Sequence, residues 1–415
     1  MRWIALSLLL TACTANDGAT SSASPTSGDD DETTDSDITS DTATTETSLP
    51  TSFDEAFRRV DDAPEGTMWG GADVAIADDG TVLISWVDER TTERLVYLVR
   101  SDDFGETFGP SMAVPTEGNP VAQPWTQPTL NIVGDTVGIT AMEWIPGPQT
   151  RGFGYTADLS DLAFGPGVQG PDNTIEVVHG GLDPNGDLWL AWIDYPPGGA
   201  TVYFSNPGTG YVERPMVFDG LPGNACPCCP ISLIWTAAGE PVIAWRHNVN
   251  DIRNMVVATG APGAYTLANA VFATSTDWFI IGCPANGPHL FEYADTTLAM
   301  SWSDSSSGSP LVYLTTSSDG GATWSPEHIV APNMDEPQLN PVVHESQSGD
   351  IYVGIHSTNS MPVAISTDGG ASFADPIELV TPDGALDWIE YANGAGMTVV
   401  VGQTTAGSIW YKRIE

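Results

Sequence analysis

The chain has 415 residues, of which 54 are acidic and 12 are basic, so its formal net charge at pH 7 is −42. A surface with this charge repels phosphate backbones, and no nucleic-acid partner is expected. The acidity suits solubility in a surface-exposed or saline environment more than it indicates a particular chemistry.

The first residues resemble a bacterial lipoprotein signal peptide. The apolar stretch from Ile4 to Leu10 is too short to span a bilayer. It leads into Leu10-Thr11-Ala12-Cys13, which is similar to a lipobox. The resemblance implies that residues 1–13 end at a lipidated Cys13, which holds the protein to the cell envelope, on the periplasmic side or at the cell surface. An incidental or buried Cys13 is the alternative.

Residues 14–50 form a second segment. They are rich in Ser, Thr, Asp, Ala and Gly and contain no aromatic and no basic residue. Such a composition cannot bury enough apolar surface to fold, so we expect a disordered acidic tether. Residues 51–415 then make up the folded domain.

The folded domain repeats one pattern: an apolar strand, a Gly or Asp turn, and a second apolar strand that usually ends in Trp. Landmarks at the second strand recur every 47 to 58 residues, which is typical of a repeat architecture. They are Trp86, Trp144, Trp192, Trp245, Trp302, His356 and Gln403. Short strands at this spacing, four per repeat and without a helical period, predict an all-β β-propeller.

The repeat count predicts seven four-stranded blades. The copies begin near Ala72, Pro128, Ile175, Pro230, Pro288, Leu339 and Leu386. The last copy ends after its third strand, and the segment from Phe53 to Val60 resembles a fourth strand. We therefore expect the N-terminal strand to complete the last blade and close the ring. Six blades are the alternative, because the first or the seventh copy could be irregular.

Three segments between a third and a fourth strand share one eight-residue pattern. It begins with Ser-x-Asp-x-Gly-x, which is followed by Thr or Ser and then by Phe or Trp. The Asp carboxylate can accept bonds from N–H groups of its own turn, the Gly permits the reversal, and the aromatic ring packs between blades. The residues are Ser101, Asp103, Gly105 and Phe108; Ser317, Asp319, Gly321 and Trp324; and Ser366, Asp368, Gly370 and Phe373. We expect them to stabilise hairpins.

These segments resemble the Asp boxes of the sialidase-like superfamily of propellers, also called the bacterial neuraminidase repeat. The resemblance covers the folded domain at the level of the repeat. It implies that the boxes lie on the face opposite the active site. It does not settle an activity, because sialidases, other glycosidases and binding propellers all share this fold.

Exo-α-sialidases of this superfamily hold the substrate carboxylate with three Arg residues and use a Tyr, assisted by a Glu, as nucleophile. The candidates here are Arg58, Arg246 and Arg253 for the arginines and Glu390 with Tyr391 for the nucleophile. Arg58 lacks the Ile-Pro expected after the first family Arg, and a Tyr that opens an inner strand is more often a core residue. Whether the protein is an enzyme stays open.

In a propeller, the loops from strand four to the next strand one, and from strand two to strand three, lie on the face opposite the Asp-box turns. We call this the inter-blade loop face. The sequence places aromatic, acidic and basic groups there, around the mouth of the channel where propellers usually bind ligands. The predicted binding residues are Trp69, Trp125, Arg246, His247, Asp251, Arg253, His289 and Asp304.

The same face carries four cysteines. They are Cys226, Cys228 and Cys229 before the fourth repeat and Cys283 before the fifth, so their thiols converge. An even set outside the cytoplasm favours two disulfides that join the two blades. The alternative is a soft-metal site for copper or zinc, with His247 or His289 as additional ligands. The loop also resembles that of a group of bacterial sialidase-like proteins with a Cys-x-Cys-Cys loop.

Together these features predict an extracytoplasmic, lipid-anchored propeller that binds a glycan or a surface protein on its inter-blade loop face. It would contact the membrane through the N-terminal lipid alone. An exo-α-sialidase or related glycoside hydrolase is the first alternative, and a thiolate protein that binds copper or zinc is the second.

Overall fold

The computed structural model describes residues 56–414, except for 124–125, 147–148, 171–176, 207–219, 264–266 and 268. The predicted signal peptide with Cys13, and the tether, lie outside the described residues. In these described residues every regular secondary-structure element is a β-strand. They contain no helix that is long and apolar enough to cross a membrane.

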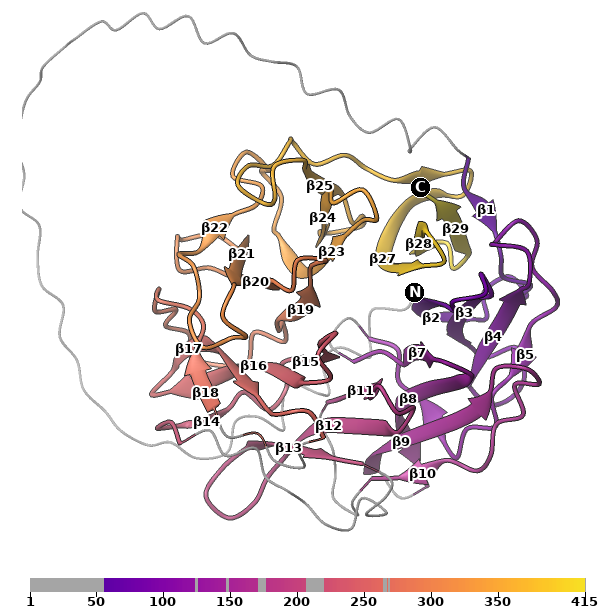
Figure 1. Ribbon diagram of the computed structural model, residues 1–415, viewed down its shortest axis with the longest axis horizontal. Helices are drawn as coiled ribbons and strands as arrows, with labels where there is room; N and C mark the ends of the chain where they lie inside the picture. Colours follow the sequence, from indigo (N-terminus) through magenta and orange to yellow (C-terminus); the bar gives the residue numbers. More distant parts are fainter. Residues whose placement is uncertain are drawn as a thin grey trace, which may run out of the picture. The chain divides into compact units, whose positions relative to one another are not determined.

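Seven sheets are arranged around a central channel as the blades of a propeller (Figure 1). Blade 1 contains β2 (Met68–Ile76), β3 (Val82–Asp88), β4 (Leu95–Ser101) and β5 (Met112–Ala113). Blade 2 contains β6 (Asn119–Pro120), β7 (Thr129–Val133), β8 (Thr136–Ile145), β9 (Gln149–Asp158) and β10 (Val168–Gln169). Blade 3 contains β11 (Val178–Leu182), β12 (Leu188–Asp194) and β13 (Thr201–Ser205).

The second half of the ring continues the pattern. Blade 4 contains β14 (Asn224–Ala225), β15 (Ile231–Trp235), β16 (Pro241–Val249), β17 (Ile252–Thr259) and β18 (Asn269–Phe272). Blade 5 contains β19 (His289–Glu292), β20 (Leu298–Asp304), β21 (Leu311–Ser317) and β22 (His328–Ile329). Blade 6 contains β23 (Leu339–Glu345), β24 (Ile351–His356) and β25 (Val363–Ser366), and blade 7 contains β26 (Val380–Thr381), β27 (Gly384–Gly394), β28 (Met397–Thr404), β29 (Ile409–Arg413) and β1 (Arg58–Arg59). The prediction of seven blades is confirmed, although blades 3 and 6 show three strands in the described residues.

The N-terminal strand closes the ring as predicted. β1 pairs antiparallel with β29, the last strand of the chain. The Val60 amide donates to the Ile409 carbonyl at 3.0 Å, and the Ile409 amide donates to the Asp61 carboxylate at 2.8 Å. The two ends of the folded domain therefore share one blade, and β1 covers the edge that β29 would otherwise expose.

The Trp landmarks fill the space between blades. Trp86, Trp192, Trp245 and Trp302 are at most 1% exposed, whereas Trp144 is 37% exposed. Two of the buried indoles donate their N–H to a carboxylate two residues further along the strand, Trp86 to Asp88 and Trp302 to Asp304, each at 2.9 Å. A buried polar N–H needs such a partner, so this Trp-x-Asp pattern supports the core.

The three Asp boxes share one hydrogen-bonding pattern. In the second box, Ser317 donates to the Asp319 carboxylate at 2.8 Å, and the Gly321 amide donates to the Ser317 hydroxyl at 2.9 Å. Thr323 donates its amide and its hydroxyl to Asp319, at 2.9 and 2.6 Å. The same bonds recur around Asp103 and Asp368. The boxes are hairpin clamps, as expected from their sequence.

The hydrogen bonds of the Asp boxes predict that the stability of the fold falls in acid. Hydrogen bonds from the Thr or Ser at the seventh position lower the pKa of Asp103, Asp319 and Asp368 to about 2. Because the folded-state pKa lies below that of an unfolded Asp, the stabilisation is present above pH ~4 and is lost as the pH falls toward 2. We expect the triple variant D103N/D319N/D368N to melt at a lower temperature than the unmodified chain at pH 6. The difference should shrink toward pH 2 in thermal scans, and a constant difference would contradict this assignment.

Candidate functional site

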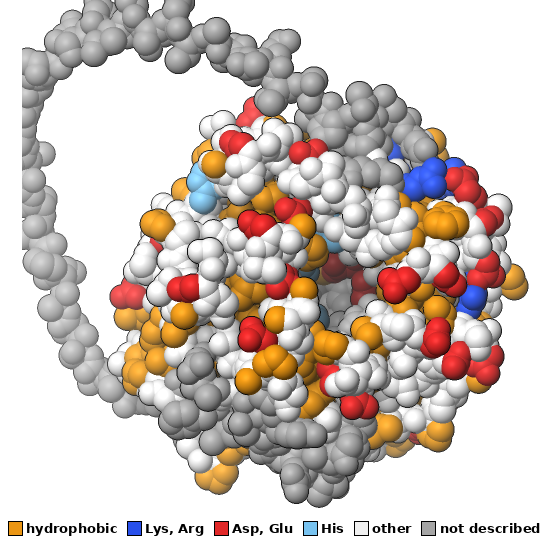
Figure 2. Space-filling model, viewed as in Figure 1, with side chains coloured by type: hydrophobic (Ala, Val, Ile, Leu, Met, Phe, Trp, Pro, Cys, Tyr) orange, Lys and Arg blue, Asp and Glu red, His pale blue; other side chains and the backbone are white. Residues whose placement is uncertain are grey.

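The central channel is a cavity with a volume of about 1010 Å³. It is hollowed through the middle of the ring (Figure 2) and lined by the innermost strands β2, β7, β11, β15, β19, β23 and β27. Its lining includes the carboxyl groups of Asp73 and Glu390 and the imidazoles of His179, His289 and His344.

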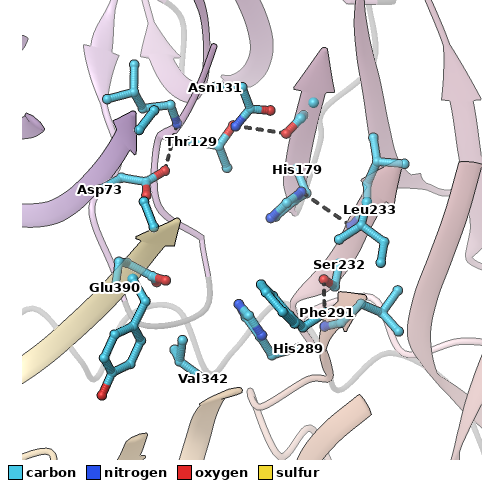
Figure 3. Close-up of a pocket in the computed structure, with 18 of the residues that line it drawn as sticks. Asp73, Thr129, Asn131, His179, Ser232, Leu233, His289, Phe291, Val342 and Glu390 are labelled. Carbon is cyan, nitrogen blue, oxygen red and sulfur yellow. Dashed lines mark hydrogen bonds between the residues drawn. The ribbon is translucent and has the colours of Figure 1, made fainter. Parts of the chain in front are cut away.

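One side-chain position on the innermost strands links blades 1 to 6 in succession (Figure 3). At this position a side chain on one strand hydrogen-bonds with the backbone of the following strand, at distances of 2.7 to 3.4 Å. The links join Asp73 to the Leu130 amide, Thr129 to the Gly180 carbonyl, His179 to the Leu233 amide, Ser232 to the Leu290 amide, and His289 to the Val343 amide. Val342, at the corresponding position of blade 6, is apolar. Several polar groups that line the channel are therefore structural.

Asp73 and Glu390 form a carboxyl pair across the junction of blades 1 and 7 (Figure 3). Burial raises the pKa of Asp73 to about 6, although the amides of Leu130 and Val74 oppose the shift. Burial and the Asp73 charge raise the pKa of Glu390 well above its usual range, while the Trp388 indole donates to it at 3.1 Å. Two acids with raised pKa values in one cavity can hold and exchange a proton near neutral pH.

Two of the histidines that line the channel have lowered pKa values. Burial lowers the pKa of His179 to about 4, and burial together with the other two histidines lowers that of His289 to about 3. Both accept a backbone N–H at Nδ1, which leaves Nε2 as their protonated nitrogen. The His344 ring stacks on Tyr391 at a centroid distance of 5.3 Å and packs at a tilt against Phe291 at 4.5 Å.

The second cluster lies between the loops that lead into blades 4 and 5. A disulfide joins Cys228 to Cys283, while Cys226 and Cys229 are free thiols, both fully buried. The Sγ atoms of Cys226 and Cys229 are 2.7 Å apart. Those of Cys226, Cys228 and Cys283 all lie within 4.8 Å of one another. The predicted connection between the two blades is present as one disulfide rather than two.

The three sulfur atoms could hold a metal ion, but only after reduction, because Cys228 and Cys283 are bonded to each other. Neither predicted additional ligand joins them. His247 Nδ1 accepts from the Trp245 indole and its Nε2 faces the Pro222 carbonyl, and His289 lies in the channel. The oxidised state therefore does not fit a metal centre.

Arg246 organises the loops around this cluster. It is completely buried, and its guanidinium donates to the Asn286 carbonyl and side chain, the Arg253 carbonyl and the Ser303 carbonyl, at 2.6 to 3.1 Å. In the described residues these partners are neutral oxygens and not carboxylates. Burial lowers the pKa of Arg246, and the charges of Cys229 and Cys226, once ionised, and of Asp304 oppose this shift. The buried charge therefore favours ionised sulfur beside it.

Arg253 is the second cation of the cluster. It is 7% exposed, its Nη1 lies 3.2 Å from Cys226 Sγ, and its Nη2 lies 3.5 Å from Asp251 Oδ1. The hydrogen bond from Cys229, together with Arg253 and Arg246, lowers the pKa of Cys226 to about 7. Burial and the bond to Cys226 raise the pKa of Cys229 well above its usual range. One thiol of the pair is thus ready to ionise and the other is held protonated.

The structure separates the residues selected from the sequence. Arg246, His247, Arg253 and Asp304 are at most 7% exposed, and His289 lines the channel. Trp69 is 40% exposed and the Asp251 side chain 44% exposed, both at the surface. Trp125 lies outside the described residues. Arg58 pairs with Glu106 beside the first Asp box.

Glu390 and Tyr391 are adjacent on β27. Both residues line the channel, and the Tyr391 ring in addition stacks on Tyr352 of blade 6 at a centroid distance of 5.8 Å. Asp73, His179 and His344 were not singled out in the sequence. The signal that could have found them is a polar residue on the first strand of successive repeats.

Comparisons with known proteins concern the fold. No family model and no curated protein matches the sequence. A structure of an ulvan lyase, from a new family of polysaccharide lyases, has a TM-score of 0.53 at 8% identity, covering 85% of this chain and 94% of the other. A Hadza microbial sialidase gives 0.45 at 11% identity, covering 83% and 65%, and a Trypanosoma rangeli sialidase in complex with the inhibitor DANA gives 0.44 at 11%, covering 84% and 55%. The fold is a seven-bladed β-propeller. The chain spans less than two thirds of either sialidase, and identities this low show the fold alone.

The carboxyl pair predicts a pH-dependent stability. Because the folded-state pKa values of Asp73 and Glu390 are raised, the stability of the protonated pair is fully present below pH ~4 and is lost as the pH rises through about 6 and beyond. We expect Glu390→Gln to raise the melting temperature at pH 7 by a few degrees, roughly 2–4 °C, and to give no gain at pH 4. The exposed Glu65→Gln is the control and should change neither value. A gain of equal size at both pH values would refute the pairing.

The buried guanidinium predicts a large stability effect. Arg246→Met leaves three backbone carbonyl oxygens and the side-chain oxygen of Asn286 without their donor. We therefore expect the free energy of unfolding, measured in urea, to fall by about 3 kcal/mol. The control Arg58→Met removes an ion pair whose side chains are 45% and 48% exposed, and should cost less than about 1 kcal/mol. Equal effects of the two variants would show that Arg246 does not hold the loops together.

Proposed function

We propose that the protein is an extracytoplasmic, lipid-anchored propeller that binds a glycan on its inter-blade loop face. The observation that carries the proposal is a set of exposed aromatic side chains at strand ends and loops of that face. Trp69 is 40%, Trp144 37%, Tyr195 47% and Phe279 64% exposed, and Ile281, two residues after Phe279 in the chain, is 78% exposed. Single exposed apolar residues are ordinary, but their concentration on one face points to a binding surface.

The chemistry of this face favours a sugar over a protein. Exposed Trp, Tyr and Phe rings present rigid apolar faces at little entropic cost, and polar groups beside them can orient hydroxyl groups. Trp69 shows this arrangement, because the Arg94 guanidinium lies 4.0 Å from its ring and its indole N–H donates to Glu89 at 2.8 Å. The net charge of −42 disfavours a polyanionic ligand, so a neutral glycan is the better match.

Location outside the cytoplasm and a lipid anchor at Cys13 are part of the proposal. The lipobox supports the anchor, and the Cys228–Cys283 disulfide is consistent with an oxidising compartment.

A glycoside hydrolase is the second candidate, and the Asp73–Glu390 pair favours it. Two carboxyl groups, one held protonated, are the minimum for acid–base cleavage of a glycosidic bond. The exo-α-sialidase version has less support, because no Arg or Lys is among the described residues that line the channel. A substrate carboxylate there would meet two acids instead of three guanidinium groups.

The full chain carrying Cys13→Ser, which removes the lipid, can be applied to an array of neutral and acidic oligosaccharides. We expect retention of neutral glycans, and at least tenfold weaker binding by Tyr195→Ala and Phe279→Ala. The control is Phe104→Ala, because Phe104 is 47% exposed on the opposite, Asp-box face. Retention of no glycan, or equal losses in all three variants, would refute the proposal. Cleavage of a bound glycan that Glu390→Gln abolishes would establish the second candidate instead.

A further inference from the structure

We propose that Cys226, Cys229 and the Cys228–Cys283 disulfide form a thiol–disulfide exchange centre, in which a buried dithiol and a partly exposed disulfide trade their sulfur–sulfur bond. The inference does not depend on glycan binding or on the channel. It rests on the distances among the four sulfur atoms, on their different exposure, and on the two buried arginines that surround them.

Proximity is the first support. Cys226 Sγ lies 2.7 Å from Cys229 Sγ and within 4.8 Å of both sulfur atoms of the disulfide. Exchange begins when a thiolate attacks a disulfide sulfur, so the attacking atom needs only a small local movement. The Cys226 amide is bonded to the Arg246 carbonyl at 2.8 Å, and the Cys229 amide to the Cys226 carbonyl at 3.3 Å, which keeps both thiols in one tight turn.

The two sulfur pairs differ in access to solvent. Cys226 and Cys229 are completely buried, whereas Cys228 and Cys283 are partly exposed. An external thiol or disulfide can therefore reach the outer pair but not the inner pair. The inner pair can gain or lose its bond only through the outer one.

The arginines supply the electrostatics. Arg253 donates to Cys226 Sγ at 3.2 Å, and Arg246 is buried without a carboxylate partner in the described residues. A thiolate at Cys226 would give Arg246 an anion nearby, and it would add a second anion beside Arg253, which already pairs with Asp251. A nearby guanidinium also makes Cys226, rather than Cys229, the attacking thiol.

The chemistry balances without an added oxidant. The Cys226 thiolate attacks Cys228 Sγ, the Cys226–Cys228 bond forms, the Cys228–Cys283 bond breaks, and the electron pair leaves on Cys283, which takes up a proton. Cys229, after losing its proton, then attacks Cys226 Sγ and releases Cys228 as a thiolate. One disulfide and two thiols are present before and after. The reaction partners outside the protein are low-molecular-weight or protein thiols and disulfides.

The exchange also alters the loops. The Cys228–Cys283 bond joins the loops before blades 4 and 5, whereas a Cys226–Cys229 bond lies within one loop. These loops already touch at Gly287, where a side chain would clash with the Pro230 carbonyl at 2.2 Å and only Gly fits. The loops can thus stay packed when the disulfide moves inward.

The test starts from the Cys13→Ser chain, fully reduced and checked for native fluorescence. One equivalent of glutathione disulfide is added, and samples are quenched with acid and mapped by mass spectrometry. We expect the buried Cys226–Cys229 disulfide to form at least tenfold faster than in C228S/C283S, in which the outer pair is absent. Equal rates in the two proteins, or no inner disulfide in the chain that retains all four thiols, would overturn the proposal. So would a bound metal ion that prevents oxidation.

A trapping variant covers the case in which C228S/C283S does not fold. Cys229→Ser removes the second attacking thiol, so the Cys226–Cys228 intermediate should accumulate and leave Cys283 free for labelling by N-ethylmaleimide in the folded protein. The matched control, Cys226→Ser, should keep the Cys228–Cys283 bond and remain unlabelled. If Cys229→Ser also keeps only that bond, the dithiol does not exchange with the disulfide.

Discussion

The hydrogen bonds between innermost strands are the interaction on which the rest of the structure depends. A propeller blade is a small sheet that cannot bury both faces by itself, and its neighbours must be held at a constant spacing. Here one polar side chain at each of the five junctions from blade 1 to blade 6, such as Asp73, Ser232 or His289, binds the backbone of the next strand. The ring is thus tied together at its centre, while the Trp landmarks fill the space further out.

This arrangement explains why the channel is polar and yet largely occupied by structural groups. The imidazoles of His179 and His289 are neutral because they are buried and because they accept backbone amides. Glu390 differs, since its partner is the indole of its own strand and its neighbour is another acid. The junction of blades 7 and 1 is consequently the place in the channel where a proton can be held near neutral pH.

The two faces of the ring carry different side-chain groups. The Asp boxes close hairpins on one face with charged hydrogen bonds, and their carboxylates are fully used. On the other face, Arg246 joins the loops of blades 4 and 5 through hydrogen bonds to neutral oxygens. Its positive charge can therefore stabilise a negative charge on the nearby sulfur atoms. The exposed Phe279 and the cysteine cluster both lie in loops of this second face, so the proposed glycan site and the proposed sulfur exchange would involve neighbouring loops.

The sequence by itself determined the repeat, the seven blades, the Asp boxes and the closing N-terminal strand. These features depend on residues that are close in the chain or that recur at a constant period, so local patterns reveal them. Only the tertiary structure decided that Arg246 and Arg253 are buried, because that depends on Asn286, Ser303 and the cysteines of two separate loops. It also decided that Asp73 and Glu390 meet. They belong to the first and the last blade, and closure of the ring is the physical event that brings them together.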